Sequence, residues 1–334
     1  MKTTCDYLFH GLKLTLEGDA ALQDSLRSRL AHFQAAPSGQ SPDIHFAFHA
    51  VPDSAHHEVQ RPPGPARPIL GAEMGEVLYF DDSQQLYVNL ADRGRALCDT
   101  RTRRVRVSYL ASDPRAPWLV SHPLFTLPLA ELLKRAGLYM IHAAGAALGG
   151  KGVLLAGASG SGKTTLALAL IRGGFHFLGD DTVFLAAPGT AGEALRVLAF
   201  PDEADITDET VSFFPELSAL TRAPGAGGRP KQAFSATALY GLAPCWECQP
   251  EILVFPSPSG ADRSVIAPMP KGEALIQIIC NVLRTEPGSA QAHLDALAAL
   301  VRRCRCYRLQ TGRDFDALPA LLRRVLEENP EAAA

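Results

Sequence analysis

The chain has 334 residues, of which 47% are hydrophobic and 20% are charged, and its formal net charge is −3. This composition is typical of a globular protein, and the near-neutral charge gives no reason to expect nucleic acid or an anionic membrane as a partner. No apolar run has the length of a membrane span, and the first residues lack the apolar segment of a signal peptide, so we expect a cytoplasmic protein.

Residues 1–120 are expected to form a β-rich region. Short apolar or alternating runs recur there, and polar or glycine-containing turns separate several of them, as in meanders and hairpins. A proline-rich stretch at 61–68 is expected to be a loop. The clearest predicted strands cover 44–48, 77–80, 86–90 and 105–110.

Residues 121–334 are expected to form an α/β domain that starts with a helix at about 123–136 and ends with three helices. The three closing helices follow from leucine, isoleucine and valine recurring at three- and four-residue steps. They carry apolar stripes at 275–283, 294–301 and 318–326. Between these helices we predict an apolar helix at 164–172 and strands at 139–141, 153–156, 175–178, 183–185, 195–200 and 252–255.

Residues 157–164 match the phosphate-binding loop pattern G-x-x-x-x-G-K-[ST], the Walker A motif, at every position. A predicted strand precedes the motif and a predicted helix follows it, so backbone N–H groups and the positive end of the helix would face phosphate oxygens. Lys163 would place a charge at the β and γ phosphates, and Thr164 would offer its hydroxyl to Mg²⁺. We therefore predict that ATP and Mg²⁺ bind at Gly157, Ala158, Ser159, Gly160, Ser161, Gly162, Lys163, Thr164 and Thr165.

An acidic pair, Asp180 and Asp181, follows Thr164 by 16 and 17 residues. One predicted helix and one predicted strand fill that gap, so the end of the second strand is expected near the bound phosphates. Two adjacent carboxylates resist double ionisation unless a metal neutralises one of them, so one can bind metal while its neighbour accepts a proton. An ordinary Asp-Asp turn between two strands is the alternative interpretation.

With these segments, residues 140–185 resemble the catalytic core of the HPr kinase/phosphorylase family, whose nucleotide site is related to that of phosphoenolpyruvate carboxykinase. The resemblance implies a catalytic set of His142, Lys163 and Asp180, with Asp180 as the base toward the acceptor hydroxyl. It implies that Asp181 assists the metal, together with Thr164. The family's Glu-Ile-Arg-Gly signature is missing after the acidic pair, so the resemblance leaves open whether HPr is the acceptor and whether the phosphorylase reaction occurs.

Weaker signals come from charged residues and cysteines farther along the chain. Arg229 and Lys231 lie in a glycine-rich loop and could close over the nucleotide or remain solvated. The acids Asp202, Glu203 and Asp205 could assist metal, whereas Arg302, Arg303 and Arg305 are expected on the polar face of the second closing helix. Cys245 with Cys248 and Cys304 with Cys306 could supply four sulfurs to zinc, but their surroundings favour plain reduced thiols without zinc.

The sequence as a whole predicts a kinase that transfers the γ-phosphoryl group of ATP to a hydroxyl of a peptide, protein or small molecule. Two alternatives stay open: an ATP-binding or ATP-hydrolysing switch, which needs only the loop and a metal ligand, and a carboxykinase-like enzyme, for which the chain is short. Guanine-reading Asn-Lys-x-Asp and transporter-type Leu-Ser-Gly-Gly motifs are missing, which favours the kinase. The β-rich region is expected to help choose the acceptor, and a homo-oligomer is left open.

Overall fold

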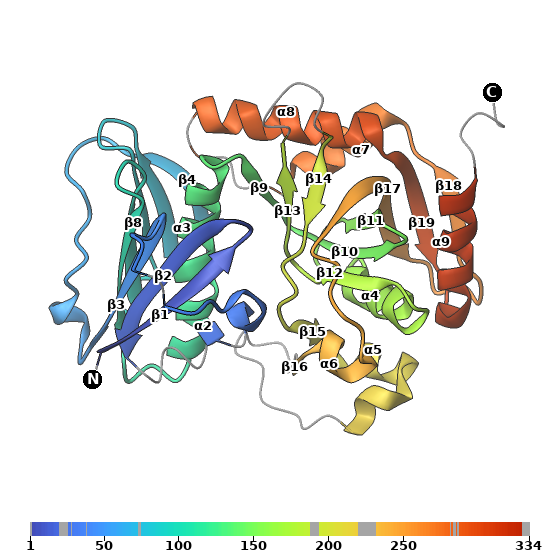
Figure 1. Cartoon of the computed structure of the whole chain (residues 1–334), viewed down its shortest axis with the longest axis horizontal. Coiled ribbons are helices and arrows are strands. Elements are labelled where there is room, and N and C mark those ends of the chain that lie inside the picture. Colours follow the sequence, from blue (N-terminus) through green and yellow to red (C-terminus); the bar gives the residue numbers. More distant parts are fainter. Residues whose placement is uncertain are drawn as a thin grey trace. The chain divides into compact units, whose positions relative to one another are not determined.

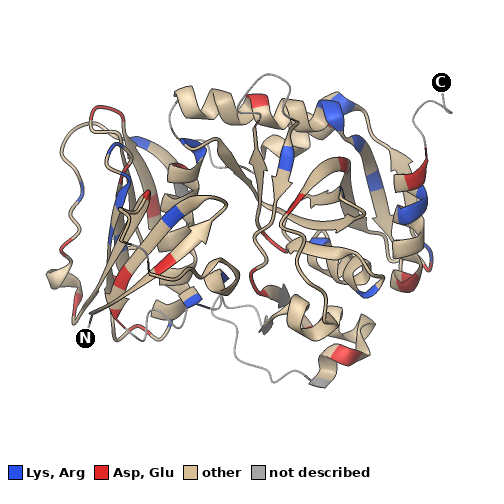
Figure 2. Ribbon diagram, in the orientation of Figure 1, with Lys and Arg blue, Asp and Glu red and all other residues tan. Residues whose placement is uncertain are grey.

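The structure is a computed structural model that divides the chain into two compact units (Figure 1). Unit 1 comprises Met1–Ala136 with Leu283–Gln291, and unit 2 comprises Gly137–Val282 with Ala292–Ala334. In the view of Figure 2, basic and acidic residues are interspersed along the elements of each unit. The structure describes residues 2–19, 26–27, 29–37, 39–72, 75–187, 194–219, 232–280, 282, 285 and 287–328.

Unit 1 is built on one mixed β-sheet. Its described strands are β1 (Lys2–Phe9), β2 (Leu12–Asp19), β3 (Ile44–Val51), β4 (Arg67–Ala72), β5 (Gly75–Phe80), β6 (Gln85–Asn89), β7 (Gly94–Asp99) and β8 (Arg104–Leu110). They lie in the order β1-β2-β3-β8-β7-β6-β5-β4. The pairs β2–β3 and β3–β8 are parallel, and the other neighbouring pairs are antiparallel. The β-rich character expected of this region is therefore present.

Two helices, α2 (Ala116–Ser121) and α3 (Pro123–Lys134), belong to unit 1. The helix α3 packs on β6 and β7, and α2 packs on β8. The buried Phe125 of α3 also packs against Phe46 of β3, with ring centroids 5.0 Å apart. This packing is the reason why unit 1 extends to Ala136, whereas the sequence placed the boundary near residue 120.

Unit 2 contains a second mixed sheet. Its described strands all lie within residues 121–334, the region expected to form the α/β domain. The strands are β9 (Leu138–Ile141), β10 (Ala143–Leu148), β11 (Lys151–Ala156), β12 (His176–Gly179), β13 (Val183–Ala186), β14 (Arg196–Leu198), β17 (Glu247–Pro258), β18 (Val265–Pro268) and β19 (Arg305–Thr311). Their order is β12-β10-β11-β17-β14-β13-β9, and β19 joins β17 to β18.

Helices cover both faces of this sheet. Alternate residues of β11 divide between two cores: Val153 and Leu155 pack with α4 (Lys163–Arg172) and α9 (Leu318–Glu327), whereas Leu154 and Ala156 face the opposite core. That opposite core includes α7 (Lys271–Ile279) and residues 296–301 of α8 (Pro287–Arg303), which lie on the other side of the strands from α4 in Figure 1. Strands buried on both faces read as continuous apolar runs, which is why the sequence pattern revealed them.

A small lobe packs beside α4 in unit 2. It consists of β15 (Ala204–Ile206), β16 (Gln232–Phe234), α5 (Asp208–Phe213), the 3-10 turn at Pro215–Ala219, and α6 (Ala236–Tyr240). The strands β15 and β16 pair with each other, and β15 and α6 both contact α4. Phe214, Leu217 and Phe234 place this lobe in the same core as α4.

The α/β class expected from the sequence is confirmed at the level of two mixed sheets with helices, and the three closing helices are present as α7, α8 and α9. The placement of Arg305 on a helix was wrong, because Arg305 begins β19, where it forms an ion pair with Glu251 at 3.2 Å. Among the described helices, none is long and apolar enough to cross a membrane.

Candidate functional site

Several strands of unit 2 end at the same edge of its sheet. The strand β17 pairs in parallel with both β11 and β19, so the carboxyl ends of these three strands point the same way. The strand β12 follows the same direction, because β11 and β12 are each antiparallel to β10, which lies between them. This register brings the segments at His142, Gly157 and Asp180 together, since they adjoin the start of β10 and the ends of β11 and β12.

The glycine-rich segment after β11 forms a tight loop around the start of α4. Gly157 has φ +154°, and a side-chain Cβ there would lie 2.9 Å from Ser161 Oγ. Gly162 precedes α4 with φ +90°, a left-handed conformation that other residues adopt only with strain. Glycines at these positions are therefore required by the backbone, and the loop reaches the N-terminal end of a ten-residue helix.

The ammonium of Lys163 lies within the curve of this loop. Its Nζ donates to the carbonyl oxygens of Gly157 at 2.9 Å and Ala158 at 3.2 Å, and the residue is only 6% exposed. The next residue, Thr164, donates its hydroxyl to Asp180 Oδ2 at 3.0 Å. The start of α4 is thus tied both to the loop and to the segment that follows β12.

The two acidic residues occupy different environments. Asp180 is 1% exposed and lies against Thr164. Asp181, in contrast, has a half-exposed side chain beside His142, whose Nε2 is 4.0 Å from Asp181 Oδ1. His142 Nδ1 lies 2.9 Å from the carbonyl oxygen of Asp181. Because a carbonyl only accepts, Nδ1 must carry the proton of this hydrogen bond, and in the neutral ring Nε2 is left as the acceptor.

A cavity of about 890 Å³ opens over the loop. Eight of the residues predicted from the sequence line it, and they include Lys163, Asp181 and His142. The others on its wall are Ser159, Gly160, Gly162, Thr164 and Thr165. Asp180, Gly157, Ala158 and Ser161 are not on the wall: Asp180 lies against Thr164, and the carbonyls of Gly157 and Ala158 accept from Lys163.

Sequence reasoning missed two further parts of the cavity wall. One comes from the small lobe, where Thr210 Oγ1 is 3.1 Å from Thr165 Oγ1 and 3.2 Å from Thr207 Oγ1. Thr207 also caps α5 by accepting from the Thr210 amide, and a Thr-Asp-Glu-Thr run of this kind is a helix-start signal. The other part comes from the ends of β17 and β19. These missed residues are Thr207, Glu209, Thr210, Ser212, Phe213, Pro258, Gly260, Thr311, Gly312, Arg313 and Phe315.

Among the described residues, the remaining sequence candidates are not on this wall. Arg229 and Lys231 lie outside the described residues. Asp202 and Glu203 lie beside the small lobe but do not line the cavity. Within the part of the chain that the structure describes, no three or more His, Cys, Asp or Glu side chains gather as a metal site made by protein groups alone. The expectation of zinc-free cysteines stays a prediction.

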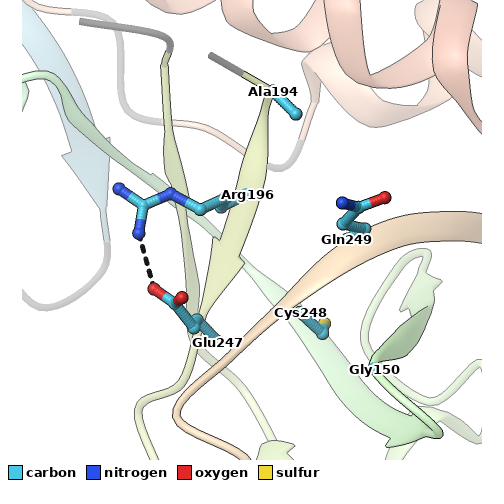
Figure 3. Close-up of a pocket in the computed structure, with 6 residues that line it drawn as sticks. All are labelled: Gly150, Ala194, Arg196, Glu247, Cys248 and Gln249. Carbon is cyan, nitrogen blue, oxygen red and sulfur yellow. Dashed lines mark hydrogen bonds and ion pairs between the residues drawn. The ribbon is translucent and has the colours of Figure 1, made fainter.

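A second hollow of about 490 Å³ lies at the opposite edge of the sheet (Figure 3). Its wall comes from the starts of β14 and β17 and from the turn between β10 and β11. The charged groups on this wall, Arg196 and Glu247, neutralise each other in an ion pair. The other residues on the wall are Gly150, Ala194, Cys248 and Gln249. This hollow has no convergence of reactive groups comparable with the loop cavity.

A comparison with protein-family models found no match for the chain, and a comparison with curated proteins found none either. Among solved structures, the chain is similar to the HPr(Ser) kinase/phosphatase from Coxiella burnetii, with 17% sequence identity and a TM-score of 0.27. The similarity covers 56% of this chain and 93% of that chain. A likeness of this size says nothing about chemistry, so the function must be inferred from the residues of the cavity.

Proposed function

We propose that the chain is an ATP-dependent kinase that transfers the γ-phosphoryl group to a hydroxyl of a peptide, protein or small-molecule acceptor. The observation that carries this proposal is the glycine loop, which wraps the start of α4 and encloses the Lys163 ammonium below an open cavity. Backbone N–H groups at a helix start and a lysine charge are suited to the oxygens of a polyphosphate.

The oxygen donors beside the loop fit a magnesium ion. Thr164 supplies a hydroxyl and Asp180 a carboxylate that already contact each other, and hard oxygen ligands are those that Mg²⁺ prefers. These two residues would hold the ion against the nucleotide. When bound, Mg²⁺ would supply positive charge to the phosphate oxygens. The sequence expected Asp181 in this role, so the proposal moves the metal contact to Asp180.

We further propose that Asp181 accepts the proton of the acceptor hydroxyl. Asp180 is buried against Thr164, whereas Asp181 lines the cavity with its carboxylate half-exposed. A base must reach the proton that it takes, so geometry favours the second acid over the first. His142 lies beside Asp181, held by the hydrogen bond from its Nδ1 to the Asp181 carbonyl, and would orient this carboxylate or share its proton.

Phosphoryl transfer depends mainly on positioning and on stabilisation of charge, and the groups on the cavity wall are suited to both. Lys163 would stabilise negative charge on the γ-phosphoryl oxygens as the bond to the β-phosphate breaks. The acceptor oxygen would approach from the side of Asp181 and His142, and its proton would pass to the carboxylate. In this proposal, separate groups of the cavity serve the phosphates and the acceptor.

Incubation with γ-labelled ATP and pools of hydroxyl-bearing acceptors tests this proposal. We expect a label that enters an acceptor as a phosphate ester, detected by mass spectrometry, and a matched reaction with Lys163→Ala should lack it. Release of labelled inorganic phosphate at the same rate with and without every acceptor would instead favour the ATP-hydrolysing switch.

A further inference from the structure

The loop cavity continues past the phosphate loop to a second end, which we call the β19 end. It is formed by Pro258, Gly260, Thr311 and Arg313, with Phe213 and Phe315 beside them. The strands β17 and β19 carry most of this wall, because both end at the edge of the sheet where the loop lies. None of these residues takes part in the phosphate or acceptor chemistry proposed above.

Thr311 is the most informative residue of the β19 end. It is 7% exposed and lines the cavity, and its hydroxyl has no hydrogen-bond partner among the described residues. Most buried hydroxyl groups in proteins are paired, and an unpaired one lowers stability. A hydroxyl in this position is explained if a bound molecule supplies the missing partner.

The turn that follows Thr311 is held rigidly. Asp314 Oδ1 accepts from both the amide and the hydroxyl of Ser264, at 2.8 and 2.6 Å, and the Ser264 hydroxyl accepts from the Gly312 amide at 2.9 Å. A Cβ on Gly312 would lie 2.5 to 2.8 Å from backbone atoms of Arg263 and Ser264, so the close approach requires glycine. This turn fixes the point from which Arg313 reaches the cavity.

The chemistry of the β19 end differs from that of the phosphate loop. Phe213 and Phe315 are in contact, with ring centroids 4.5 Å apart, and Pro258 adds further apolar surface. The polar side chains of this end are the Thr311 hydroxyl and the planar Arg313 guanidinium. Apolar surface with a few fixed polar groups is typical of sites for small heterocyclic ligands.

We propose that the β19 end holds the base and ribose of the nucleotide, with the Thr311 hydroxyl bonded to the edge of the base and Arg313 on the ribose hydroxyls. This inference rests on the proposed function, which places the phosphates at the loop. A hydroxyl can both donate and accept, so Thr311 serves adenine and guanine equally well. The enzyme therefore binds ATP and GTP with affinities within about tenfold of each other, since one adaptable hydrogen bond discriminates little.

Calorimetric binding of MgATP, MgGTP and magnesium tripolyphosphate to the full chain tests this inference. Tripolyphosphate carries the phosphates without base or ribose. Thr311→Val should weaken MgATP binding roughly three- to tenfold, because one hydrogen bond is lost, and should leave the affinity for tripolyphosphate within about twofold of the parent. Arg313→Gln should likewise weaken the binding of MgATP but not that of tripolyphosphate. Thr311→Ser, which keeps the hydroxyl, should bind like the parent and thereby exclude a packing defect.

The exposed Arg302 does not line the cavity and provides the matched control. Arg302→Gln should change the affinity for neither MgATP nor tripolyphosphate. If Thr311→Val or Arg313→Gln weakened the binding of MgATP and of tripolyphosphate equally, the β19 end would contact the phosphates. That result would overturn the inference. Unchanged MgATP affinity in both variants would overturn it as well. The variant Lys163→Ala distinguishes failure of the proposed function from failure of this inference. If it leaves tripolyphosphate binding unaltered, the loop does not bind phosphates and the proposed function is wrong.

Discussion

Two sets of polar side chains, one in each unit of this chain, differ in how they are satisfied. In unit 1, Glu131 is fully buried, yet it accepts from Lys134 at 2.8 Å and from the Thr285 hydroxyl at 2.6 Å, while Arg135 pairs with its second oxygen. Lys134 also donates to Thr285 at 2.6 Å, which closes the network on itself. In unit 2, Thr311 and the half-exposed Asp181 line a cavity instead, and the Thr311 hydroxyl has no hydrogen-bond partner among the described residues.

Structural and functional polar groups can be separated by whether the protein itself satisfies them. A buried charge is tolerated when every neighbour is satisfied within the protein, as around Glu131, and such a network leaves no capacity for a ligand. Groups that converge on a cavity, and whose hydrogen-bonding capacity the protein does not fully use, are the better candidates for binding and catalysis. Removal of one group of each kind tests this distinction.

The largest effect is expected from the acid at the cavity. Asp181→Asn removes the basic site and keeps the shape, so phosphoryl transfer should fall by roughly 10²–10⁴, the usual worth of a positioned acid or base. Asp180→Asn should instead raise the Mg²⁺ concentration needed for activity, because Asp180 contacts Thr164. Transfer rates measured as a function of Mg²⁺ separate the two variants. Recovery of Asp181→Asn, but not of Asp180→Asn, at high Mg²⁺ would show that the sequence-based roles were correct.

A large effect on stability is expected from the closed network of unit 1. Glu131→Ala leaves Lys134 buried without its carboxylate, and removal of one partner of a buried pair typically costs about 3–5 kcal/mol of unfolding free energy. Urea denaturation measures this loss. MgATP affinity, measured where the variant is still folded, should stay within about twofold of the parent, since these residues belong to unit 1. A selective loss of nucleotide binding without destabilisation would contradict the structural interpretation.

The sequence revealed the parts of the candidate site that lie close together in the chain. The loop at 157–164 and the acidic pair were found because one strand, one helix and one strand connect them, and this topology is present in unit 2. The exchange of roles proposed for Asp180 and Asp181 could not be foreseen, since it depends on which carboxylate meets Thr164 across the fold.

The β19 end was missed for a different reason. Arg302, Arg303 and Arg305 read as one basic stretch of a helix, which concealed the start of β19. The signal was present in the alternation of exposed Arg308 and Gln310 with buried Leu309 and Thr311. Pairing between strands far apart in the chain, here β17 with β19, is the information that local patterns lack.

The smallest effect is expected at the second hollow. Arg196→Gln breaks an ion pair with Glu247 between half-exposed side chains, and such pairs contribute about 0–1 kcal/mol. Thermal unfolding should therefore shift only slightly, and MgATP affinity should not change. A loss of nucleotide affinity above tenfold in this variant would mean that the hollow, and not the loop cavity, is the site.

Equilibrium binding of a fluorescent ATP analogue measures whether the loop around Lys163 binds the phosphates of a nucleotide. Lys163→Ala should weaken Mg²⁺-dependent binding at least about tenfold, because charge-assisted hydrogen bonds to phosphate are lost. Circular dichroism should show an intact fold, although Lys163 bonds to the Gly157 and Ala158 carbonyls in the structure. Binding within twofold of the parent in a folded Lys163→Ala protein would contradict the account.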